Sequence, residues 1–231
     1  MKKILFLVSI VLISCITVAQ AQVVTQKRNV GSFKGIQVSG GIDLYLTQGN
    51  TESVSISAAE DRQDDIRVDN NGGVIRIYIE NSKWGWFKWN NKPVKAYVTV
   101  KDLNSLSATG GSDVYSEKKL ELIKLTIRAT GGSDVKLEID ADEIDCSTTG
   151  GSDVTLIGNT TVLKASSTGG SDLKANKLRS SFCSVSATGG SDAYVWAEKE
   201  ISISATGGSD VYISGNARVV KKSVTGGSDV H

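Results

Sequence analysis

Seven aspartates recur at one position of a short repeat, and their carboxylates are the first groups in this sequence that could do chemistry. Each closes a copy of Thr-Gly-Gly-Ser-Asp, and the seven copies start 18 to 21 residues apart. They are Asp113, Asp134, Asp153, Asp172, Asp192, Asp210 and Asp229. Carboxylate oxygens with neighbouring backbone carbonyls are the ligands that Ca²⁺ prefers. A row of these side chains is therefore a candidate calcium site.

The same aspartates have two other interpretations. In the structural one, Asp and Ser accept hydrogen bonds from turn amides that the glycine pairs leave open. In the catalytic one, two carboxylates about 5 or 9 Å apart serve a polysaccharide-active β-helix enzyme. Such an enzyme needs two carboxylates with separated pKa values, whereas a uniform row gives every Asp the same surroundings. We therefore expect no enzyme and no cofactor, with Ca²⁺ as the one metal to test.

A second group of candidate residues is aromatic. Trp84, Trp86, Phe87 and Trp89 lie together in a segment, residues 83–93, that reads as a long hairpin loop rich in Lys and Asn. Exposed aromatic clusters mark interaction sites, and Trp faces suit stacking on sugars. The competing interpretation is that the loop folds back and plugs one end of the molecule.

The repeat determines the architecture that positions these groups. Before and after each copy, apolar or small residues alternate with polar ones, as in Leu125, Ile127 and Ala129. Alternation is typical of a strand with one buried face, and Gly pairs supply the bends. A unit of about 19 residues cannot bury its own apolar face, so the units stack. We predict an all-β fold, a parallel β-helix (β-solenoid), with the aspartates in one line about 4.8 Å apart.

The cysteines and the net charge indicate less about function than the repeat does. Cys146 and Cys183 fall on the inward side of the third and fifth coils, too far apart for a disulfide, which indicates two buried free thiols. Without the leader described next, 24 Lys and Arg face 25 Asp and Glu. This balance gives no support for nucleic-acid binding.

The first 21 residues read as a secretory signal peptide, because Lys2 and Lys3 precede a short apolar run that is too brief to span a bilayer. Ala19-Gln20-Ala21 predicts cleavage after Ala21. The alternative is a lipoprotein signal, in which Leu12-Ile13-Ser14 precedes a lipidated Cys15. Both predict an exported protein, in the periplasm, at the cell surface or outside the cell.

The remaining chain, residues 22–231, reads as a single domain. Residues 101–231 hold the repeats, and residues 22–100 read as irregular N-terminal coils. Strands are expected at Val54–Ala58, Val74–Ile79 and Val94–Val100, and Asn70-Asn71-Gly72-Gly73 predicts a turn.

Two stretches resemble a known family. Residues 33–44, Phe-Lys-Gly-Ile-Gln-Val-Ser-Gly-Gly-Ile-Asp-Leu, and residues 98–103, Val-Thr-Val-Lys-Asp-Leu, lead into the repeats. They are similar to the putative auto-transporter adhesin, head GIN domain family, over about residues 30–231. The resemblance implies a right-handed parallel β-helix in an exported bacterial envelope protein, and no catalytic residues.

Together these features predict a non-catalytic, adhesin-like structural or binding module of the cell envelope with a protein or glycan partner. A calcium-binding scaffold is the further alternative. The last coil also predicts self-association through the C-terminal edge, because an uncovered coil exposes unpaired backbone groups. Lys221 and Lys222 oppose that pairing, since lysines on an edge discourage it.

Overall fold

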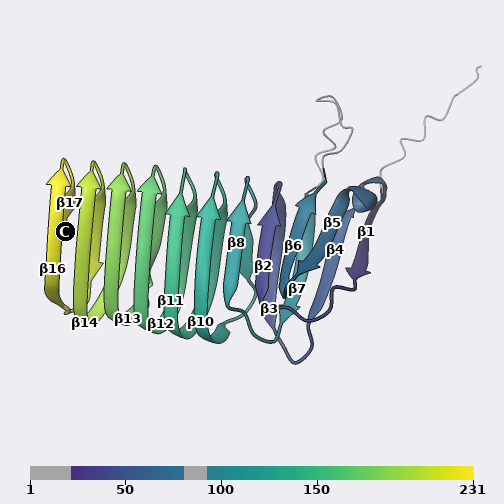
Figure 1. Ribbon diagram of the computed structural model, residues 1–231, viewed down its shortest axis with the longest axis horizontal. Helices are drawn as coiled ribbons and strands as arrows, with labels where there is room; N and C mark the ends of the chain where they lie inside the picture. Colours follow the sequence, from purple (N-terminus) through teal and green to yellow (C-terminus); the bar gives the residue numbers. More distant parts are fainter. Residues whose placement is uncertain (1–21, 81–92) are drawn as a thin grey trace, which may run out of the picture.

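The molecule is one long stack of β coils (Figure 1), seen in a computed structural model that describes residues 22–80 and 93–231. Strands make up 74% of the described residues and helix 3%, and the parallel coils repeat about every 19 residues. The predicted β-solenoid is therefore confirmed.

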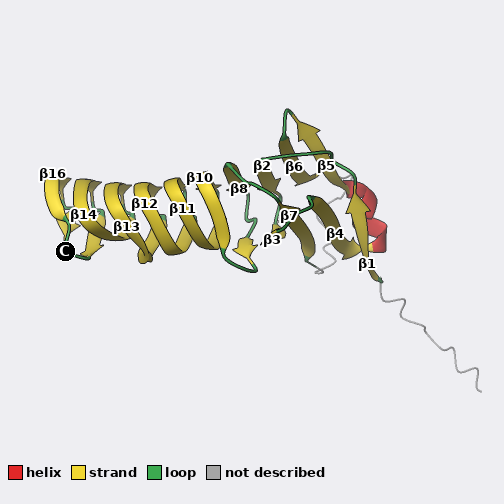
Figure 2. Ribbon diagram, turned by 90° about the horizontal axis from the view of Figure 1, so that it is seen from below, coloured by secondary structure: helices red, strands yellow, loops and turns green. Residues whose placement is uncertain are grey.

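In the repeat region each long strand runs from the aspartate after one turn to the threonine or glycine of the next turn, so it winds around the stack (Figure 2). Neighbouring strands pair in parallel, with Asp134 beside Asp153 and Thr130 beside Thr149. The strands are β8 (Ser105–Thr109), β9 (Val114–Ser116), β10 (Leu120–Thr130), β11 (Asp134–Thr149), β12 (Asp153–Gly169), β13 (Asp172–Gly189), β14 (Asp192–Gly207), β15 (Asp210–Ser214), β16 (Arg218–Gly226) and β17 (Asp229–Val230).

The alternation of residue types sets which side chains enter the core. Ile127, Cys146, Ala165 and Val185 pair in register and form one buried column inside the stack. Burying a side chain of the Val, Leu or Ile class stabilises a fold by about 1.5–3 kcal/mol. A column of such residues therefore links each coil to the next.

Cys146 and Cys183 are both buried and free, as predicted. Cys146 stands beside Ala165, whereas Cys183 stands beside Leu163, so the two occupy different columns. Burial raises the pKa of the Cys146 thiol and raises that of Cys183 to about 12. Both are thus uncharged core residues at neutral pH.

The first coil in the sequence is not the first coil in space. β2 (Gly35–Ser39) pairs with β6 (Val74–Ile79) on one side and with β8 on the other. β3 (Ile42–Gln48) lies likewise between β7 (Val94–Val100) and β9. The coil made by β2 and β3 is therefore inserted between two coils that come later in the chain, as Figure 1 shows for β2, β6 and β8.

The N-terminal end is closed by antiparallel pairing instead of further coils. β4 (Ser53–Ala59) pairs antiparallel with β7, and β1 (Val23–Arg28) pairs antiparallel with β4. β5 (Ile66–Asn71) and β6 form a hairpin around Gly72 and Gly73, at the predicted turn, and follow the short 3-10 helix η1 (Glu60–Asp65). In the described part of the chain, no helix is long and apolar enough to cross a membrane.

Candidate binding surfaces on the coils

The turn of each repeat places Ser inside and Asp outside. The seven serines of the repeat are at most 7% exposed. In the turns at Thr168, Thr188 and Thr206 the Ser Oγ accepts from the Thr amide of its own turn, at 3.1–3.2 Å. In two earlier turns the amides of Ser112 and Ser133 donate to the Ser Oγ one coil further on, at 3.3 and 3.1 Å, and the Ser209 amide does the same in a later turn (3.3 Å).

The turns in which the Thr amide donates to its own Ser differ from the earlier turns in backbone conformation. Gly150 and Gly151 both have positive φ (71° and 75°), as in a type I′ turn. In the next turn Gly169 has φ of 87°, but Gly170 is outside the left-handed region, as in a type II′ turn. The repeat turns up to Gly151 all have both glycines at positive φ, and in the repeat turns after it only the first glycine has positive φ.

The aspartates form the predicted row along the outside of the stack, one per coil. Register pairs join Asp134, Asp153, Asp172, Asp192, Asp210 and Asp229 in order. Asp113 stands next in the row, because the amide of Asp134 donates to its Oδ1 at 3.3 Å. The amides of Asp172 and Asp229 donate in the same way to Asp153 (3.3 Å) and Asp210 (3.2 Å). The row is thus part of the inter-coil hydrogen bonding, in line with the structural interpretation.

Two carboxylates along this row, Asp134 and Asp43, have a raised pKa. Desolvation raises the pKa of Asp134, and the neighbouring Asp113 and Asp153 raise it further. Desolvation and Asp113 likewise raise the pKa of Asp43, which continues the row beyond the repeats. A raised folded-state pKa means that the charged form is disfavoured in the fold, so stability increases as pH falls through that pKa.

We therefore predict that Asp134→Asn stabilises the chain at pH 7 and loses this advantage at low pH. The neutral amide removes the repulsion yet keeps an oxygen acceptor. Thermal melts at pH 7 and about pH 4 measure the effect. Asp64→Asn in η1, an exposed position outside the row, is the matched control. A gain in Tm for Asp134→Asn that is the same at both pH values would contradict the repulsion account.

A second row, which the sequence reasoning missed, runs two residues after each aspartate and carries tyrosines. Tyr45 stacks between Tyr97 and Tyr115, with ring centroids 5.3 and 5.7 Å apart. Tyr212 stacks between Tyr194 (4.6 Å) and His231 (4.7 Å). Aligning the repeats on Asp would have revealed this row. Because the rings stack on one another, most of their faces are covered.

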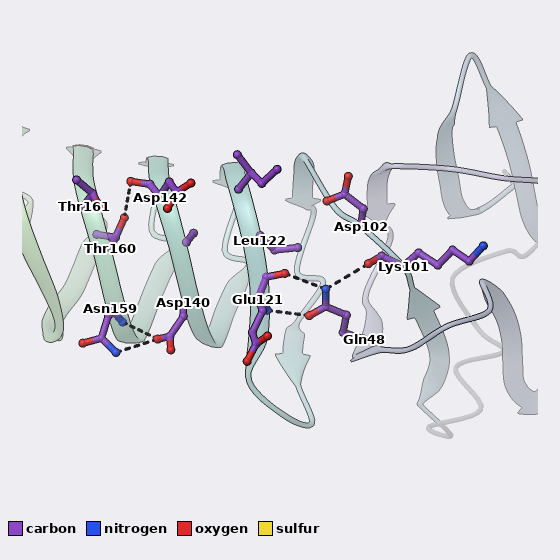
Figure 3. A pocket seen from close by; sticks show the side chains of 12 residues that line it. Gln48, Lys101, Asp102, Glu121, Leu122, Asp140, Asp142, Asn159, Thr160 and Thr161 are labelled. Carbon is purple, nitrogen blue, oxygen red and sulfur yellow. Dashed lines mark hydrogen bonds between the residues drawn. The ribbon is translucent and has the colours of Figure 1, made fainter.

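A groove of about 660 Å³ lies at the bend opposite the turns, and Figure 3 shows the side chains that line it. Gln48 joins two coils there, since its Nε2 donates to the carbonyl of Glu121 (2.8 Å) and its Oε1 accepts from the Glu121 amide (2.7 Å). Asp140 accepts two hydrogen bonds from Asn159, both 3.0 Å. The Asn159 side chain, followed by Lys119, holds the pKa of Asp140 below its usual value despite desolvation. Such a carboxylate is a poor general acid.

The predicted aromatic site, Trp84, Trp86, Phe87 and Trp89, lies outside the described residues. The strands that flank it, β6 and β7, do not pair with each other but form the two sides of one coil. The hairpin loop expected at residues 83–93 stays a prediction.

The last described coil is the one for which self-association is predicted. All of β16 is exposed, including Val219 and Val220. Lys222 pairs with buried Ile203, so a lysine takes a register position that is apolar in the inner coils. Inward charges of this kind discourage edge pairing. Self-association stays a prediction, and light scattering across a concentration series tests it: a strict monomer contradicts it.

Comparison with known proteins identifies the family of this chain. A family model described as "Putative auto-transporter adhesin, head GIN domain" matches residues 32–217. The chain belongs to this family. The matched part of this GIN-domain protein covers β2 to β15 and six of the seven repeat aspartates.

Three solved structures share the fold. A putative adhesin from Bacteroides fragilis NCTC 9343 has a TM-score of 0.85 and 23% identity, over 91% of this chain and 97% of that one. A putative adhesin from Parabacteroides merdae ATCC 43184 has a TM-score of 0.72 and 20% identity, over 90% of this chain and 95% of that one. A putative lipid binding protein from Parabacteroides distasonis ATCC 8503 has a TM-score of 0.70 and 18% identity, over 90% of this chain and 96% of that one. At these identities the similarity establishes the fold alone. No curated protein matches the GIN-domain chain.

Proposed function

We propose that this GIN-domain protein is a non-catalytic, exported module of the cell envelope that binds a glycan or protein partner through the outer faces of its coils. The observation that carries the proposal is the regular outer surface, on which an Asp row repeats at one position per coil beside a second row that carries tyrosines in several coils. Repeated groups at a strand spacing of about 4.8 Å suit an extended partner that is contacted at several equivalent points. The family description as an adhesin supports the same proposal.

A glycan array tests this function most directly, with the chain from Gln22 probed in the presence and absence of calcium. We expect binding to a limited set of extended glycans. The same chain immobilised against envelope proteins and against lipid vesicles covers the other partner classes. Vesicle binding alone would favour a lipid-directed role, such as the one in the name of the Parabacteroides distasonis protein. Binding in none of the three assays would contradict the proposal.

A polysaccharide-active enzyme is the main alternative, and the groove at the bend is where it would act. Its carboxylates Glu121 and Asp140 stand on adjacent coils. The lowered pKa of Asp140 argues against it as a proton donor. Release of reducing ends from a polysaccharide, abolished by Glu121→Gln, would establish the enzyme in place of the binding module.

A calcium-binding row is a second candidate because of one local arrangement. Ligand atoms of Asp210, Asp229 and His231 all lie within 4.8 Å of one another. If Ca²⁺ binds the native state alone, calcium at ten times its Kd stabilises the fold by about 1.4 kcal/mol. Melting curves in chelator and in millimolar calcium measure this, with Asp210→Asn as the variant that should lose the shift. No shift in the unmodified chain would leave the row purely structural.

A further inference from the structure

The tyrosine row is interrupted in the middle of the stack, and the interruption is lined by cations. Between Tyr115 and Tyr194 the row positions hold Lys136, Thr155 and Lys174, which pair in register. The small Thr155 thus stands between two long side chains. A hollow of about 330 Å³ opens there, lined by Lys136, Thr155, Ile157, Lys174, Asn176, Lys177 and Tyr194. We call it the basic hollow.

A bulge in β13 shapes this hollow. Thr155 pairs with Lys174 and Ile157 pairs with Lys177, so β13 has one more residue than β12 over this stretch. The extra residue belongs to the 20-residue repeat, whereas the two preceding repeats have 19. Bulges redirect side chains and are frequent beside functional sites. Here the bulge brings Asn176 and Lys177 to the rim of the hollow.

The lysines of the basic hollow differ in their partners. Lys174 forms ion pairs with Asp153 (3.2 Å) and Asp172 (3.3 Å), so it is held against the aspartate row. Within residues 22–80 and 93–231, no carboxylate lies at ion-pair distance from Lys136 or Lys177. Asp153 is itself engaged, because its Oδ1 accepts from the Asp172 amide and its Oδ2 from Lys174. Two unpaired ammonium groups therefore remain for an anion.

An aromatic face forms the wall on the C-terminal side. The face of the Tyr194 ring that is farther from the hollow stacks on Tyr212, with ring centroids 4.6 Å apart and an interplanar angle of 6°. Its near face is directed along the stack toward Lys174, the preceding residue in the row. No ring among the described residues stacks on that face. Ile157 adds apolar surface, and Thr155 and Asn176 add hydroxyl and amide groups.

We propose that the basic hollow binds an acidic sugar residue, a uronate or a sulfated hexose, of an extended glycan. An aromatic face with hydrogen-bonding groups and unpaired lysines matches a pyranose ring that bears an anion. The volume lies at the lower end of the range for small-molecule sites, as expected for one ring. This inference rests on the proposed glycan-binding function and adds the ligand class and the coils that bind it.

Titration calorimetry with defined oligosaccharides tests the inference. The probes are an oligogalacturonate, its methyl ester as the neutral match, and a sulfated galactose oligomer. Lys136→Gln with Lys177→Gln removes the two unpaired charges. Thr155→Tyr fills the hollow, and it should fold because the same row accepts tyrosine in the coils of Tyr115, Tyr194 and Tyr212. Lys27→Gln with Lys118→Gln, two exposed lysines away from the hollow, is the charge-matched control.

We expect at least one acidic probe to bind and the methyl ester to bind more weakly. The double lysine variant should bind about tenfold more weakly or worse, because each of its two substitutions removes a charge-assisted contact to the ligand. Thr155→Tyr should abolish binding with an unchanged Tm, and the control should bind like the unmodified chain. Equal binding of acid and ester, or unchanged binding by both hollow variants, would overturn the inference while leaving glycan binding in place. Failure of every acidic probe would overturn it too, and the glycan array then decides the proposed function separately.

Discussion

Replacing Gly158 with alanine is expected to destabilise the solenoid by about 2–5 kcal/mol, because left-handed strain adds to a backbone clash. Gly158 lies in β12 with φ of 126°, and an added Cβ would stand 2.1 Å from the carbonyl oxygen of Ile139 on the adjacent coil. That oxygen belongs to the backbone, so no side-chain rotation relieves the contact. Chemical denaturation of the variant and the unmodified chain measures the loss.

Two other glycines serve as graded controls, since both have open space around an added Cβ. Gly151→Ala retains the strain of φ 75° and should cost about 1–2 kcal/mol. Gly170→Ala, at the same position of the next repeat, has no such φ and should be neutral or stabilising by about 0.4–1 kcal/mol. Equal effects at Gly151 and Gly170 would contradict the two turn conformations.

Ser191→Ala is expected to cost about 1–3 kcal/mol, because it leaves buried backbone groups without partners. The Ser191 Oγ accepts from the Thr188 amide (3.1 Å) and is within donor distance of the Ser167 carbonyl (3.0 Å), which belongs to the preceding coil. Its side chain thus joins two coils in a region closed to water. The free energy of unfolding in urea measures the loss.

Ser184→Ala is the matched control for this prediction. Ser184 has the same side chain on the exposed side of β13, the strand that precedes the turn of Ser191, so its replacement should change stability by less than about 0.5 kcal/mol. If Ser191→Ala behaves like Ser184→Ala, the serine of the repeat is not a structural element, and its recurrence needs a functional explanation.

Much of the repeat region could be predicted from the sequence, since its register follows from the spacing of identical pentapeptides. The line of aspartates from Asp113 to Asp229 and the burial of Cys146 and Cys183 follow from counting positions relative to Thr-Gly-Gly. Alternation also placed the strands at Val54–Ala58 and Val94–Val100, because one buried face requires a period of two.

Strand order in the N-terminal part could not be predicted in this way. Alternation states which face of β2 is buried, but it does not state which strands lie beside it. β2 and β8 begin at Gly35 and Ser105, which are far apart in the sequence yet pair directly. The pairing depends on backbone hydrogen bonds, which any strand of suitable length offers, and on long-range packing.

The turns and the basic hollow were beyond sequence reasoning for a different reason. Gly151 and Gly170 stand in identical pentapeptides yet adopt different conformations, so the determinant lies in the surrounding coils. The hollow arises from a small residue, Thr155, next to a bulge at Asn176. The row itself was within reach, since Tyr115, Tyr194 and Tyr212 all follow their aspartates by two positions.

The insertion of the β2 and β3 coil between later coils also determines how the chain can fold. Gly35 cannot gain both of its strand neighbours until Val74 and Ser105 have been brought to it, which requires closure of a loop of 70 residues. The later coils need closures of only about one repeat each. Loop closure becomes entropically more costly with length, and distant pairings slow folding. Nucleation at the N-terminal end should therefore be slow, and growth toward the C-terminus should be rapid and stepwise, one coil at a time.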